Sequence, residues 1–218
     1  MAKMKVAVLV SGRGSNLQAL LDACAGADFP ADIVAVISNK AGAQGLERAR
    51  KAGVAASFID HTLFDEREAF EKELDAKLKE TGAQLVALAG FMRILTAWFV
   101  ERWKDRLINI HPSLLPAFRG VHTHERALEQ GVRLHGATVH YVRPDMDDGP
   151  IIGQAAVPVL PGDDADALAA RVLEAEHALY PACLKLIAEG KARVTAERVK
   201  IDKTAAADGA ALLINPHR

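Results

Sequence analysis

Short runs of consecutive apolar residues alternate along the chain with longer segments in which apolar residues recur every three or four positions. The runs are typical of strands buried on both faces, and the wider spacing is typical of amphipathic helices. The predicted strands are residues 5–10, 32–39, 56–59, 84–90, 107–111, 136–143 and 151–160. The predicted helices are residues 17–24, 43–52, 65–80, 122–129 and 163–189.

This alternation of strands and helices predicts the α/β fold class. Parallel strands need crossover connections, so we expect a Rossmann-like three-layer α/β/α arrangement around a mostly parallel twisted sheet. A loop at 144–150 joins the last two strands, and Pro158 lies in the second of them, which indicates an antiparallel edge. No repeat or linker appears, so residues 1–218 are expected to form one domain, with a core at about 5–190 and a tail at 191–218.

The composition narrows the classes of protein. The 27 Lys and Arg and 28 Asp and Glu give a net charge of -1, so no global field favours nucleic acid or an anionic membrane. Cys24 and Cys183 lie in apolar helical patterns, which indicates reduced core thiols rather than a disulfide framework. No apolar run approaches the ~18 residues of a membrane span, and no signal peptide is recognised, so we expect a soluble, cytoplasmic protein.

Two polar residues, Asn109 and His111, end the apolar run at 107–108. On an extended backbone, residues two apart leave the same face, so the amide and the imidazole should point together beyond the strand end. Pro112 then biases the chain away from further regular structure. Open α/β sheets build their sites at such ends, although the pair could instead cap the strand and be satisfied by neighbours.

A glycine-rich loop follows the first predicted strand, with Gly14, Ser15 and Asn16 leading into the first predicted helix. Glycines allow the backbone to approach a ligand, and the free amides of a helix start favour phosphate. The alternative is a tight turn in which Ser15 or Asn16 is the N-cap. The loop is neither a Walker A sequence, since it lacks the lysine, nor a dinucleotide fingerprint, since Leu17 replaces the third glycine.

A long ordered series of motifs surrounds the polar pair. It comprises Asn109-Ile110-His111-Pro112-Ser113-Leu114-Leu115-Pro116, Phe118-x-Gly120, His122-Thr123, His135-Gly136 and Asp147-x-Gly149-Pro150. The series resembles the folate-dependent formyltransferases that use 10-formyltetrahydrofolate, and the early glycine loop resembles their glycinamide ribonucleotide branch. The resemblance covers roughly residues 5 to 190. It implies formyl transfer from 10-formyltetrahydrofolate, as co-substrate, to the amine of glycinamide ribonucleotide in purine synthesis.

The resemblance also implies roles for individual residues. Gly14, Ser15 and Asn16 are expected to hold the substrate phosphate, and Glu176 the glycinamide or ribose portion. Without the resemblance, Glu176 would be an exposed-looking helix charge. The expected folate contacts are Arg67, Leu88, Met92, Arg93, Ile94, Leu95, Val142 and Asp145.

The implied chemistry is direct attack of the amine on the formyl carbon. Asn109 and a protonated His111 would donate to the oxyanion, and Asp147 would stabilise that imidazolium and relay a proton through water. No covalent intermediate is expected. Asp148 departs from the Asp-Gly-Gly-Pro form common in relatives, which is expected to stiffen the loop.

The remaining histidines do not indicate a metal site. His122, His124, His135 and His140 fit no familiar zinc spacing, so no metal is expected, and the last two are expected to line the substrate cleft. The partners expected are small molecules, with no nucleic acid and no membrane, for a monomer or a homodimer. The alternatives are a methionyl-tRNA formyltransferase, which carries a further β-barrel, a formyltetrahydrofolate hydrolase, which carries an extra N-terminal module, and a catalytically silent folate or nucleotide-binding module.

Overall fold

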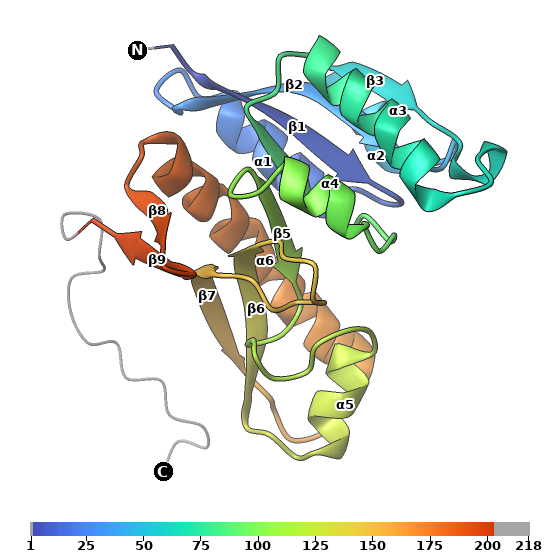
Figure 1. Cartoon of the computed structure of the whole chain (residues 1–218). Helices are drawn as coiled ribbons and strands as arrows, with labels where there is room; N and C mark the ends of the chain where they lie inside the picture. Colours follow the sequence, from blue (N-terminus) through green and yellow to red (C-terminus); the bar gives the residue numbers. More distant parts are fainter. Residues whose placement is uncertain (1, 203–218) are drawn as a thin grey trace.

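The computed structural model describes residues 2–202 and is built around a seven-stranded sheet (Figure 1). The strand order is β3-β2-β1-β4-β5-β6-β7, with parallel pairing from β3 to β5 and antiparallel pairing from β5 to β7. The strands are β1 (Met4–Val10), β2 (Ala31–Ser38), β3 (Ala55–Phe58), β4 (Leu85–Leu88), β5 (Leu107–His111), β6 (Leu134–Tyr141) and β7 (Ile151–Pro158). The predicted mostly parallel sheet with an antiparallel edge is confirmed.

Helices cover both faces of the sheet. They are α1 (Ser15–Cys24), α2 (Gln44–Lys51), α3 (Arg67–Glu80), α4 (Ala97–Arg102), α5 (Thr123–Glu129), α6 (Ala165–Ala188) and the 3-10 turn η1 (His61–Leu63). In Figure 1, α3 and α4 lie in front of the sheet and α1, α2 and α6 behind it. The predicted three-layer arrangement is therefore confirmed.

Alternate residues of the central strand show why both layers form. Val6, Val8 and Val10 of β1 belong to the apolar cluster under α1, α2 and α6, whereas Ala7 and Leu9 belong to the cluster under α3 and α4. All five are fully buried. Successive side chains of a strand point to opposite faces, so an unbroken apolar run requires helices on both sides.

Besides η1, the structure contains a helix and a hairpin that the sequence pattern did not predict. Helix α4 lies in the segment after β4, and a separate hairpin joins β8 (Ala192–Thr195) to β9 (Arg198–Ile201). The hairpin occupies part of the predicted tail, so the tail begins with ordered structure, and residues 203–218 of it lie outside the described residues. The division into a core and a tail within one domain stays a prediction.

Candidate active site

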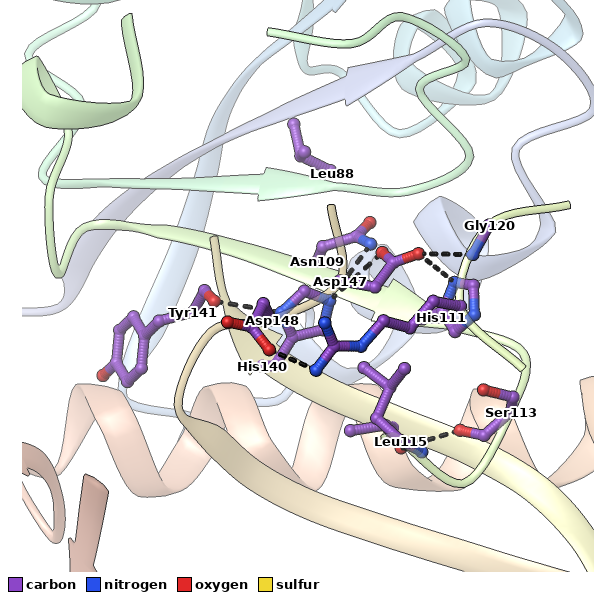
Figure 2. A network of polar contacts seen from close by, with 12 residues as sticks. Leu88, Asn109, His111, Ser113, Leu115, Gly120, His140, Tyr141, Asp147 and Asp148 are labelled. Carbon is purple, nitrogen blue, oxygen red and sulfur yellow. Dashed lines mark hydrogen bonds and ion pairs between the residues drawn. The ribbon is translucent and has the colours of Figure 1, made fainter. Parts of the chain in front are cut away.

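The two polar residues of β5 lie between the ends of the neighbouring strands. Asn109 is in register with Leu88 of β4 on one side and with His140 of β6 on the other. Its amide Nδ2 lies 3.4 Å from Nε2 of His140. Nδ1 of His140 donates to the Tyr141 carbonyl at 2.9 Å, so the neutral ring leaves Nε2 as the acceptor for Asn109 (Figure 2). Burial lowers the pKa of His140, which favours this neutral form.

Asp147 reaches this pair from the loop between β6 and β7. Its Oδ2 lies 3.5 Å from Nδ1 of His111 and accepts from the backbone N–H of Gly120 at 2.9 Å. Its Oδ1 lies 3.8 Å from Nε2 of His140. The structure therefore brings Asn109, His111 and Asp147 together at the carboxyl end of β5, as the motif series implies (Figure 2).

Both ring nitrogens of His111 face acceptors. Nδ1 faces the Asp147 carboxylate, and Nε2 lies 3.0 Å from the Phe118 carbonyl oxygen. Only the imidazolium, with two N–H groups, donates to both. An oxyanion would therefore have to replace the Phe118 carbonyl as the acceptor for Nε2, whereas the Asn109 amide has a second N–H for it.

The glycine loop is shaped for close backbone packing. Gly14 is the N-cap of α1 with φ +69°, and a Cβ on it would lie 2.8 Å from Cα of Gly45 at the start of α2. Ser15 and Asn16 are already in the helix, and no described side chain caps α1, so the alternative in which one of them is the N-cap is wrong. Arg48 of α2, which the sequence did not single out, donates through Nε to the Arg13 carbonyl at 2.8 Å and braces the loop.

Asn16 links the glycine loop to the last helix. Its Nδ2 donates to Oε2 of Glu176 in α6 at 2.7 Å. Glu176 is 6% exposed, so the exposed-looking position expected from the sequence is wrong. Burial raises its pKa, opposed by the hydrogen bond from Asn16. A buried carboxyl with one amide partner keeps acceptor capacity for an N–H or O–H of a ligand.

The expected folate contacts gather on the α3 and α4 side. Leu88, Leu95 and Val142 share one apolar cluster, whereas Met92 and Ile94 are 71% and 61% exposed. Buried Ser11, a link that the sequence did not reveal, accepts from the Met92 N–H at 2.8 Å and donates to Asn39 at 2.6 Å. This bond ties the segment 92–95 to the end of β1.

Two of the expected folate contacts are arginines, and both lie at helix α3. The third charged contact, a carboxylate, lies on the loop between β6 and β7. The Arg93 guanidinium lies over the Phe70 ring, with 5.7 Å from Cζ to the centroid. Arg67 is exposed at the start of α3, three residues before Phe70 and thus on the same helix face. Asp145 is exposed in the loop that carries Asp147.

His135 does not line an open cleft, because its side chain is only 1% exposed. Its ring packs edge-on against Phe118 and His124, with centroids 5.7 and 5.3 Å away. Burial lowers its pKa from 6.5 to about 4. His140 is buried too but reaches the site through Asn109 and Asp147.

The buried neutral His135 predicts acid sensitivity. An unfolded histidine binds its proton near pH 6.5 and the folded one near pH 4, so the free energy of unfolding falls as the pH drops between these values. We expect this residue to lower the free energy of unfolding by about 2 kcal/mol when the pH falls from 7.5 to 5. Urea unfolding of His135→Phe at the two pH values should show a smaller fall than the wild type. The exposed His122→Asn should behave like the wild type, and equal falls in all three proteins would contradict the prediction.

Within residues 2–202, no group of three or more His, Cys, Asp and Glu side chains is placed to hold a metal ion. No helix in this part of the chain combines the length and the apolar character needed to cross a membrane.

The chain is similar to known proteins over most of its length. Residues 4–184 match the family described as formyl transferase. Phosphoribosylglycinamide formyltransferase of Escherichia coli (strain K12) is 49% identical over 191 residues, covering 88% of this chain and 90% of that protein. The trifunctional purine biosynthetic protein adenosine-3 of Drosophila pseudoobscura pseudoobscura is 52% identical over 197 residues. This chain spans 14% of the length of that trifunctional protein.

A solved structure agrees with these relatives. Glycinamide ribonucleotide transformylase 1 from Symbiobacterium toebii superposes with a TM-score of 0.90 at 46% sequence identity, covering 92% of this chain and 95% of that one. The family match, the sequence identity and the fold agree over most of the chain. The chain therefore belongs to the formyl transferase family.

Proposed function

We propose that this protein is an enzyme that transfers the formyl group of 10-formyltetrahydrofolate to the amine of glycinamide ribonucleotide. The products are formylglycinamide ribonucleotide and tetrahydrofolate. The observation that carries the proposal is the meeting of the Asp147 carboxylate with His111, beside Asn109, at the carboxyl end of β5. The similarity to the phosphoribosylglycinamide formyltransferase of E. coli supports this choice of acceptor.

The nucleotide is proposed to bind over α1. The uncapped amides at Ser15 and Asn16, with Gly14 in the left-handed region, suit a phosphate, because amides and the helix dipole both favour an anion. Glu176 lies 2.7 Å from the Asn16 amide and faces the same ligand from α6. The phosphate and the sugar or glycinamide portion would thus be held by two elements joined through one hydrogen bond.

The folate is proposed to bind between the segment 92–95 and the loop that starts at Val142. Exposed Met92 and Ile94 offer apolar surface to the pterin, and buried Leu88 and Leu95 with partly buried Val142 form the wall behind it. The cations Arg67 and Arg93 suit the anionic tail of the folate, and Asp145 on the loop is proposed as a polar contact to the ring. This places the formyl group next to Asn109.

The reaction is proposed to be direct attack of the amine on the formyl carbon. The Asn109 amide and the His111 imidazolium would donate to the oxyanion, and Asp147 would hold His111 and a water that carries the proton from the amine to the folate nitrogen. Neutral His140 would orient the Asn109 amide, because its Nε2 is an acceptor. No covalent intermediate and no metal enter the scheme. The proposed partners are small molecules, without nucleic acid or membrane, for a cytoplasmic monomer or homodimer.

A formyl-transfer assay tests the proposed function. The absorbance of the folate is followed with 10-formyltetrahydrofolate present and glycinamide ribonucleotide either present or absent. Turnover only with the nucleotide is expected. Folate conversion without the nucleotide would identify a hydrolase, and no conversion in either case would favour a binding module.

The Ser15→Ala substitution tests the phosphate assignment. We expect the KM for glycinamide ribonucleotide to rise about tenfold, because a hydrogen bond to a charged group contributes roughly 1.5 kcal/mol or more. The KM for the folate should stay constant. Ser57→Ala, the same change on the outer strand β3, is the matched control. An effect on the folate KM alone would contradict the assignment.

A further inference from the structure

The loop at residues 142–150, here called the Asp147 loop, holds its carboxylate in a demanding backbone conformation. Asp147 has φ +53°, in the left-handed region that a residue with a Cβ rarely adopts. The neck of the loop is closed by hydrogen bonds from Tyr141 N–H to the Pro150 carbonyl and from Val142 N–H to the Leu107 carbonyl, both 2.9 Å. Contacts beyond the neck must therefore keep the carboxylate facing His111.

Arg143 supplies such contacts at the start of the loop. Its side chain is 10% exposed and lies between two carboxylates, with Nη2 2.7 Å from Asp105 and Nε 2.7 Å from Glu197. Nη1 donates to the Val142 carbonyl at 3.1 Å. Asp105 lies two residues before the start of β5, and Glu197 lies in the turn between β8 and β9. The guanidinium is thus held from three directions by three parts of the chain.

The same arginine touches the other end of the loop. A Cβ on Gly149 would lie 3.3 Å from Cγ of Arg143 and 1.7 Å from the Tyr141 carbonyl oxygen. The arginine stem therefore packs against the backbone two residues after Asp147. A groove between the loop and the hairpin is lined by Asp148, Gly149, Pro150, Ile151, Glu197, Arg198 and Val199. In Figure 1 the orange-red hairpin lies beside the start of β7, where the loop ends.

We propose that the hairpin β8–β9 supports the Asp147 loop and that Glu197 is a positioning residue, acting through Arg143 on Asp147. The inference rests on the proposed function, and it assigns a role to a hairpin that lies beyond the residues 4–184 matching the family. Arg143 packs across the neck, and without Glu197 its guanidinium keeps only Asp105 and the Val142 carbonyl as partners. The weaker hold lets the loop leave, part of the time, the conformation that faces His111. Only molecules with the loop in place turn over, so kcat falls with that fraction.

Glu197→Gln is a suitable probe because the Glu197 side chain is 62% exposed and its removal leaves no buried cavity. We expect kcat to fall about three- to tenfold, as for loss of a charge-assisted contact, while the KM for glycinamide ribonucleotide changes less than about twofold. The KM for the nucleotide should stay constant because the glycine loop is held by a different contact, the hydrogen bond from Asn16 to Glu176. The thermal midpoint should move by no more than about 2 °C.

Glu80→Gln is the matched control. Glu80 has a similar side-chain exposure of 65% and a similar ion pair, 2.8 Å from Lys77. Glu80 is the last residue of α3, at the end of the helix away from Arg67 and the site. The Glu80→Gln substitution should therefore leave kcat unchanged.

A double variant separates positioning from general support. In an Arg143→Gln background, Glu197→Gln should lower kcat no further, because the two residues act in series. An additive loss in the double variant would overturn the proposal, as would a wild-type kcat in Glu197→Gln. A lower thermal midpoint together with a rise of both KM values would also overturn it. The hairpin would then stabilise the fold as a whole and would have no specific effect on the Asp147 loop.

Hydrogen exchange gives a readout that does not need activity. In Glu197→Gln, the amides of Tyr141 and Val142 at the loop neck should exchange faster, whereas those in the centre of β6 should exchange as in the wild type. Faster neck exchange in a protein without transferase activity would support the loop inference and refute the proposed function. Unchanged neck exchange would overturn the inference whatever the activity.

Discussion

Replacing Asp147 by asparagine is expected to lower kcat at least ~tenfold and to leave the KM for glycinamide ribonucleotide nearly unchanged. The substitution keeps the shape of the side chain, and its carbonyl oxygen can still accept from the Gly120 N–H. It removes the negative charge that lies 3.5 Å from His111, so the imidazolium loses its stabilising partner and the water that relays the proton is held less firmly. The nucleotide should bind as before, because its phosphate is assigned to the separate loop at Gly14.

Steady-state kinetics with each substrate varied in turn measure this effect. Asp32→Asn is the matched control: the same chemical change at a surface carboxylate at the amino end of β2, whose partner is Lys3. Exposed ion pairs contribute little, so this variant should lose less than about threefold in kcat. Wild-type turnover in Asp147→Asn would remove the carboxylate from the mechanism.

Asn109→Ala is expected to lower kcat by about 10²- to 10³-fold, the usual cost of removing one oxyanion donor. The amide is placed by its register between Leu88 and His140, and its Nδ2 lies 3.4 Å from the His140 ring. His111 carries its Nε2 proton towards the Phe118 carbonyl, so Asn109 is the donor with a free N–H in this structure. Its loss should therefore be felt in the transition state rather than in substrate binding.

Single-turnover and steady-state rates, with thermal unfolding as a check on folding, measure the effect of Asn109→Ala. The lost contact to His140 should cost only about 1 kcal/mol of stability, as for a single hydrogen bond. A rise in KM with an unchanged kcat would reassign Asn109 to ground-state binding. The histidine side of the site is then tested by His140→Phe, which removes the acceptor for Nδ2 and should reproduce part of the loss.

The centre of the sheet could be predicted because its strands are apolar runs. The observed β1 and β2 begin within a residue of their predicted positions, since burial on both faces leaves a signal in nearly every residue. Helix α4 was missed because it has six residues, too few for a periodic pattern. The hairpin β8–β9 was missed because its strands have four residues each, and only alternate residues of each strand are covered by other parts of the chain.

The sequence by itself determined the local parts of this protein: the fold class, the shared face of Asn109 and His111, and the glycine-rich loop that leads into α1. These depend on neighbours within a few positions, where backbone geometry follows residue type. Only the tertiary structure decided which distant groups meet, such as Asn16 with Glu176, and Arg143 with Glu197. Such contacts depend on how loops and helices pack across the sheet. A spacing along the chain does not encode a distance through space, so burial of Glu176 and the role of the hairpin had no signal in the pattern of residues.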